Sequence, residues 1–175
     1  MAALAVDDLF EAEIFPEFPF RNRHWLAVAF ERNSHDNTRM PEWFFRAASK
    51  HFNPDGKSKL LVKGDCFALD GQLAEVIAVA FDWESYRDFM LSRAGFSIEY
   101  KMANDDGTCA CWADAELTIF GGAFDKMIKL LDDHGGRNSM LTRIEEEFFL
   151  DERAGNEDMR AFFRGLLFPE CRNDR

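Results

Sequence analysis

The chain has 175 residues, 47% of them hydrophobic, which suffices for the core of one domain. Its net charge of −11 and pI of about 4.8 argue against binding to nucleic acid or to an anionic membrane. No stretch approaches the roughly 20 apolar residues that span a bilayer, and the acidic N-terminus lacks the basic region of a signal peptide. We therefore expect one cytoplasmic domain over residues 1–175, with its four cysteines as free thiols.

Residues 1–20 are expected to form an acidic N-terminal arm, because they contain five carboxylates and no lysine or arginine. Apolar side chains from Val6 to Ile14 are spaced for a short helix. The prolines of FPEFPF (15–20) prevent a regular helix there. We expect this stretch to lay its three phenylalanines across the core in extended geometry. The alternative is a proline-rich docking motif with exposed rings.

A strand and a helix follow the arm. Bulky and small side chains alternate through residues 24–32, which predicts a strand. Pro41 suits the first position of a helix over 41–52. That helix places Phe44, Ala48 and Phe52 on one side.

Two hairpins are predicted next. The apolar runs 59–69 and 72–81 flank Asp70-Gly71, a strong hairpin turn. A helix over 82–95 separates this hairpin from the next one. Asp82 can cap its start and Gly95 can end it.

The second hairpin spans residues 96–120, with its turn at 104–107. Its return strand is expected to run unbroken to Phe120, where Gly121-Gly122 ends it.

Three helices complete the chain, over 123–134, 140–152 and 157–168. Ser139 and Asn156 are candidate caps for the last two. The total is about five strands and five helices. The prediction is an α+β fold: a mainly antiparallel sheet with helices packed on one face and a helical C-terminal third.

Cys109 and Cys111 are two residues apart on a predicted strand, so both thiols point to one face. They could supply half of a zinc or copper site, but no C-x-x-C or H-x-x-x-H provides the other half. Strict alternation continues their face through apolar residues to Ile119. We therefore expect buried thiols, with no metal and no cofactor.

Trp112, Asp114 and Glu116 fall on the opposite face of the same strand, together with Thr118. This row has three interpretations. It is a solvated sheet face, a partner-binding face anchored by an exposed Trp112, or a catalytic carboxylate pair. A catalytic site could add His35 from a polar loop, although the four histidines are scattered.

The stretch 143–158 is strongly acidic. It is either a solvated helical face or a patch that complements a basic protein. Its candidate binding residues are Glu145, Glu146, Asp151 and Glu152.

These features favour a protein-binding inhibitor over a catalyst, because no catalytic or cofactor motif is recognised. In size, acidity and fold class the chain resembles bacterial immunity proteins, which neutralise toxic nucleases and other effectors. The resemblance is one of general character and transfers no residue. It implies a cytoplasmic module that occludes the active site of a basic toxin or effector domain. The alternatives are a small enzyme with a carboxylate or histidine site, a small-ligand binder with a phenylalanine-lined cavity, and a structural component.

Overall fold

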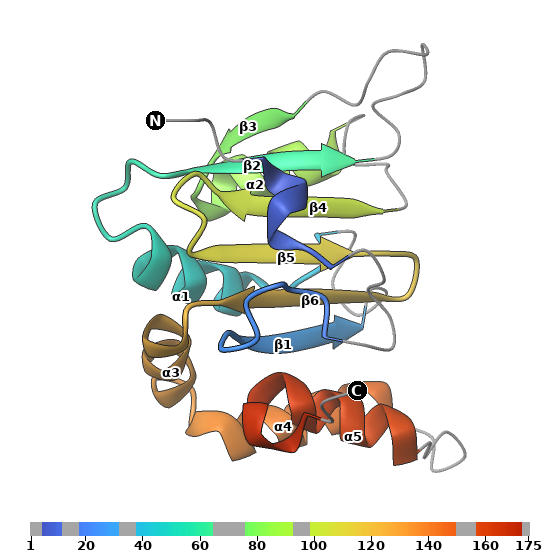
Figure 1. The fold of residues 1–175 in the computed structure, drawn as a ribbon. Coiled ribbons are helices and arrows are strands. Elements are labelled where there is room, and N and C mark those ends of the chain that lie inside the picture. The colour runs from blue at the N-terminus through green and yellow to red at the C-terminus, as the bar shows by residue number, and fades with distance from the viewer. Residues whose placement is uncertain are drawn as a thin grey trace.

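The computed structural model describes residues 5–11, 18–31, 38–64, 76–92, 99–149 and 157–172. Their strands form one six-stranded antiparallel sheet, in the order β1-β6-β5-β4-β2-β3 (Figure 1). The strands are β1 (Leu26–Glu31), β2 (Lys59–Gly64), β3 (Ile77–Ala80), β4 (Tyr100–Asn104), β5 (Cys109–Ala113) and β6 (Leu117–Gly122). The predicted α+β class is confirmed, with one strand more than expected.

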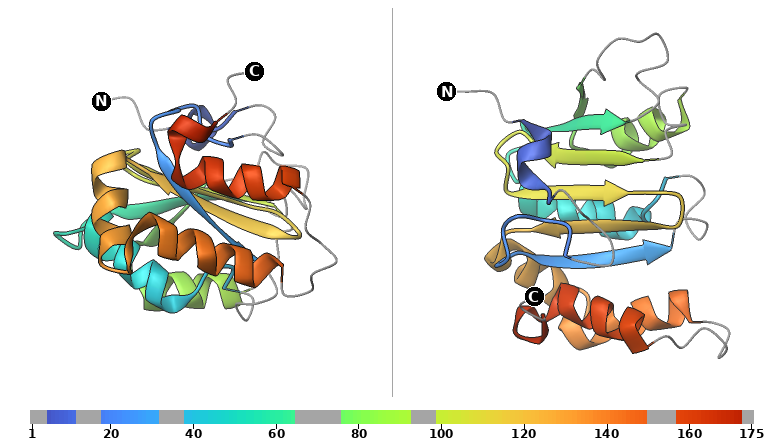
Figure 2. Two further views of the ribbon diagram at one scale, coloured as in Figure 1. Left: turned by 90° about the horizontal axis from the view of Figure 1, so that it is seen from below. Right: turned by 45° about the vertical axis from the view of Figure 1, so that its right-hand side comes forward.

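Helices cover one face and one edge of this sheet. They are α1 (Glu42–Phe52), α2 (Trp83–Leu91), α3 (Phe124–Asp132), α4 (Gly136–Phe148) and α5 (Glu157–Leu167), with 3-10 turns η1 (Val6–Leu9) and η6 (Pro169–Cys171). In Figure 1, α1 and α2 lie behind the sheet and η1 lies in front. Helices α4 and α5 pack along the β1 edge (Figure 2). None of the described helices is long and apolar enough to cross a bilayer.

The predicted pairings and caps hold for much of the chain. Strands β2 and β3 form the first hairpin, although its Asp70-Gly71 turn lies outside the described residues. Asp82 caps α2 by accepting the backbone N–H of Ser85 at 2.8 Å. Gly95 and Asn156 lie outside the described residues.

Two helix starts differ from the sequence prediction. Pro41 is the N-cap residue of α1 in extended geometry, not its first helical residue. Helix α4 begins at Gly136, so Ser139 is inside the helix and does not cap it. Gly135 and Gly136 both have positive φ, of 95° and 83°, a conformation that glycine adopts without strain. Gly135 precedes α4 and Gly136 is its first residue, so both lie at the junction with α3.

The expected return strand is two strands. A tight turn at Asp114–Glu116 separates β5 from β6, and Ala113 pairs with Thr118. Four residues, Asp114 to Leu117, lie between the paired residues Ala113 and Thr118. Because this number is even, the alternation of β5 is reversed in β6, as a one-residue change of register exchanges the two faces of a strand. Thr118 therefore shares a face with Cys111, and Ile119 shares a face with Trp112, the opposite of the prediction.

Gly121 and Gly122 do not end the strand but belong to β6. A Cβ on Gly121 would lie 2.8 Å from Cδ2 of the Phe20 ring, and one on Gly122 would lie 2.5 Å from the Phe52 ring. Real Cβ atoms do not approach other atoms so closely. The two glycines therefore let one aromatic ring pack directly on each face of the sheet.

The N-terminal arm is part of the core. Phe10, Phe18 and Phe20 are all at least 95% buried, and Phe10 forms an isolated antiparallel bridge with Phe20. The extended-arm interpretation is confirmed for residues 18–20, while Phe15 lies outside the described residues. The sheet is consequently covered on both faces, by helices on one side and by the arm on the other.

Candidate functional site at one end of the sheet

Trp112 is only 5% exposed. Trp112 pairs with Ile119, and Ala110 pairs with Gly121, so all four residues lie on one face of the sheet. The Phe20 ring packs on Gly121. This is therefore the face that the N-terminal arm covers. Its indole N–H donates to the Glu99 carboxylate at 3.1 Å. The expectation of an exposed tryptophan on an outward polar row is therefore wrong. The arm that buries this face is remote in sequence from the strand.

Asp114 and Glu116 lie in the turn between β5 and β6. The Asp114 carboxylate accepts the backbone N–H groups of Glu116 at 2.7 Å and Leu117 at 2.9 Å. The Glu116 side chain is exposed. One carboxylate thus caps the turn and the other projects from it, so the two do not form the converging pair that acid–base chemistry needs. His35, the histidine considered with them, lies outside the described residues.

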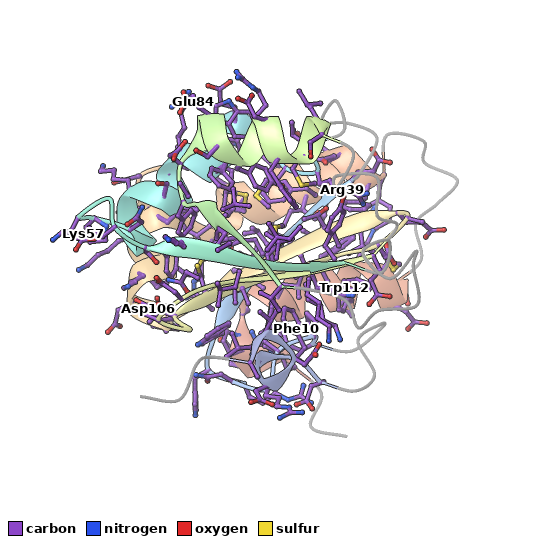
Figure 3. All side chains as sticks on the ribbon, turned by 90° about the horizontal axis from the view of Figure 1, so that it is seen from above. Phe10, Arg39, Lys57, Glu84, Asp106 and Trp112 are labelled. Atoms are coloured by element: carbon purple, nitrogen blue, oxygen red, sulfur yellow. The ribbon has the colours of Figure 1, made fainter. Side chains whose placement is uncertain are left out.

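Arg39 donates a hydrogen bond to the backbone of this turn. It is 2% exposed, and its guanidinium donates to the Asp114 carbonyl at 2.9 Å and lies 4.6 Å from the centre of the Tyr100 ring. Its φ of 68° is unusual for a residue with a side chain. Figure 3 shows Arg39 and Trp112 on opposite sides of the sheet at the same end. No motif in the sequence singles out Arg39.

The C-terminal end of α4 joins the same end of the sheet. The Glu147 carboxylate accepts the backbone N–H of Glu31 at 2.6 Å, and Glu31 pairs with Leu117. Glu145 lies 3.7 Å from Arg160 on α5, and Glu146 is exposed.

The turn Asp114–Glu116 and the described part of the acidic stretch 143–158 are therefore neighbours in space through the end of β1. Asp151 and Glu152 lie outside the described residues. We call the carboxylates gathered here the acidic end: Glu31, Glu99, Asp114, Glu116, Glu146 and Glu147.

The cysteine pair packs in the core as predicted. Cys109 and Cys111 are 1% and 2% exposed, and burial raises the pKa of both thiols, which keeps them protonated. Among the described residues, no three histidine, cysteine or acidic side chains are grouped to hold a metal ion. Cys66 lies outside the described residues.

A cavity of about 10 Å³ lies beside these thiols, lined mainly by apolar side chains that include Met40, Cys111 and Phe120. It has room for about one water molecule. This cavity is far smaller than the few hundred Å³ of a typical ligand pocket. The phenylalanines around it fill the core.

No protein-family model, curated protein or solved structure matches this chain significantly. The residues and their geometry are therefore the basis for inferring its function.

Proposed function

We propose that this chain is a cytoplasmic protein-binding inhibitor of the immunity-protein kind. In this proposal the acidic end contacts a basic toxin or effector domain and occludes its active site. The support is the net charge of −11 together with the gathering of carboxylates from four separate segments at one end of the sheet.

The observation that carries the proposal is the link from Glu147 to β1. Because Glu147 accepts the Glu31 N–H and Glu31 pairs with Leu117, the acidic helix and the acidic turn are held in a fixed relation. A rigid arrangement of charges favours specific recognition, since little conformational entropy is lost when a partner binds. Opposite charge on the partner would also speed the encounter and fix its orientation.

The test uses the product of the gene adjacent to this one, if that gene encodes a toxin-like protein, as the binding partner. We would measure its association rate with the wild type and with the variant Glu116→Lys/Glu146→Lys, whose original side chains are exposed. We expect the rate to fall about tenfold or more at low salt, and the difference to shrink at high salt. Wild type should also protect cells that express the toxin.

The matched control is Asp88→Lys/Asp132→Lys, which changes the net charge equally at exposed positions outside the acidic end. Its association rate should stay within about twofold of wild type. Absence of binding and protection by the wild type would overturn the proposed function. Equal loss in both double variants would show that only net charge matters and would remove the acidic end as the contact surface.

A further inference from the structure

Arg172 in the C-terminal segment is bound by backbone carbonyls from two other parts of the chain. Its Nε donates to Gly165 at 2.6 Å, and Nη2 donates to Trp25 at 2.6 Å and to Leu166 at 3.3 Å. Nη1 donates to the Arg23 carbonyl. The planar fork of one guanidinium thus reaches four carbonyls at once.

An aromatic ring completes the enclosure. The guanidinium carbon lies 3.5 Å from the centre of the Phe18 ring, well within cation–π range. Burial lowers the pKa of Arg172 to about 10, so the side chain remains charged at neutral pH. The cation is held in these contacts by carbonyl dipoles and a ring. We call the Phe18 ring and the carbonyls of Arg23, Trp25, Gly165 and Leu166 the guanidinium cage.

The cage and its occupant come from different segments. Gly165 and Leu166 lie in the last turn of α5, where the helix dipole favours a cation. The other cage groups belong to the N-terminal arm and the residues leading into β1. Arg172 itself follows the short turn η6, which lies beside the arm (Figure 2). The cage is therefore a surface that the end of the chain covers.

We propose that the guanidinium cage is an arginine-binding site that the chain's own Arg172 occupies, and that an arginine of a basic protein partner can replace it. The statement that the replacing arginine comes from a basic protein partner rests on the proposed function. The binding chemistry does not, because any guanidinium of the right shape presents the same planar donors. Lysine is a poor substitute, since its ammonium cannot donate in one plane to several carbonyls.

The experiment is chemical rescue of the full-length variant Arg172→Ala. Its thermal unfolding would be followed with N-acetyl-arginine amide at tens of millimolar, and with N-acetyl-lysine amide or sodium chloride at the same concentration. The arginine compound should raise the midpoint of the variant by about 2–5 °C through binding to the folded state. It should raise the midpoint of the wild type by much less, because there Arg172 competes with the compound for the cage.

The control variant Arg164→Ala removes an exposed arginine of α5, the helix that supplies two cage carbonyls, and should show no rescue. If Arg172→Ala does not fold, hydrogen exchange of the wild type gives the answer. Excess N-acetyl-arginine amide should speed exchange of the Cys171 and Arg172 amides, which donate to the carbonyls of Phe168, the N-cap of η6, and Pro169.

No arginine-specific rescue in a folded Arg172→Ala, or equal rescue by the lysine compound or by salt, would overturn the arginine site. If the variant does not fold, unchanged exchange in the wild type would overturn it. Neither measurement involves the toxin. A failed rescue therefore leaves the acidic-end proposal standing, and a failed toxin-binding test leaves the rescue result standing.

Discussion

At the scale of single residues, Gly121 allows the Phe20 ring to pack directly on the sheet. A Cβ on Gly121 would overlap the Phe20 ring, so Gly121→Ala must displace the ring or the arm. We expect a loss of about 1–3 kcal/mol in the free energy of unfolding, measured by urea denaturation.

Gly165→Ala is the matched control for this substitution. The new Cβ would meet its nearest neighbour at 3.5 Å, and a helical alanine is favoured by about 0.5–1 kcal/mol over glycine. It should leave stability unchanged or raised. Similar destabilisation by both substitutions would contradict the packing argument.

Thr118 shows the consequence of the reversed alternation in β6. It is fully buried, and its hydroxyl finds no hydrogen-bond partner within the described part of the chain. Thr118→Val replaces a buried polar group by a methyl of similar shape and should add about 1 kcal/mol to the free energy of unfolding.

Thr142→Val, at an exposed position of α4, tests whether the gain comes from burial. It should change stability by less than about 0.5 kcal/mol. A destabilised Thr118→Val would mean that the hydroxyl has a partner.

At the scale of elements, Asp114 makes the β5–β6 turn. Asp114→Ala removes both hydrogen bonds to the turn amides and should cost about 1 kcal/mol in urea unfolding, while Asp114→Asn keeps an acceptor and should cost less. Glu116→Ala, in the same turn, should change stability by less than about 0.5 kcal/mol. An equal cost for the two alanine variants would refute the capping role.

A second element-scale contact ties η1 to the sheet. Asp7 pairs with Lys63 and, at 3.5 Å, with Lys101. The hydrogen bond from Lys63 lowers the pKa of Asp7. A lowered pKa in the folded state means that the pair stabilises the protein above the unfolded pKa of about 3.9, and that this contribution disappears as the pH falls through the folded value.

The variant Asp7→Asn should therefore be less stable than wild type from pH 7 to about pH 5. The difference should vanish in stronger acid. Because Asp7 is half exposed, the effect should be below about 1 kcal/mol and should weaken in salt. Urea denaturation at pH 7, 5 and 3 checks this. A difference as large at pH 3 as at pH 7 would contradict the ion-pair explanation.

The helices, strands and turns differ in how far a single sequence predicts them. Helix α2 with its Asp82 cap and the β2–β3 pairing follow from local patterns. The β5–β6 turn was missed because Asp114-Ala115-Glu116 contains no glycine, proline or asparagine. The aspartate was the available signal, since its side chain can cap a turn. The burial of Trp112 depends on an arm some 90 residues away, and alternation along one strand carries no information about such a cover.

At the scale of the whole molecule, the arm, the sheet and the helices share one hydrophobic core. We expect a single cooperative unfolding transition. Tryptophan fluorescence reports on Trp25, Trp83 and Trp112 in different parts of this core and on the more exposed Trp43. Its transition in urea should coincide with that of far-ultraviolet circular dichroism. Separate transitions would show that part of the chain unfolds independently.

The two edges of the sheet differ in a way that limits how copies of this protein can join. Helices α4 and α5 and the Glu147 carboxylate close the β1 edge. Within the described chain β3 has a strand neighbour on one side only, and its Ala78 and Ala80 are exposed. A molecule with one open edge can add one further strand by edge pairing. Two copies joined there would have no open edge left, so such pairing would stop at two and could not propagate into a fibre.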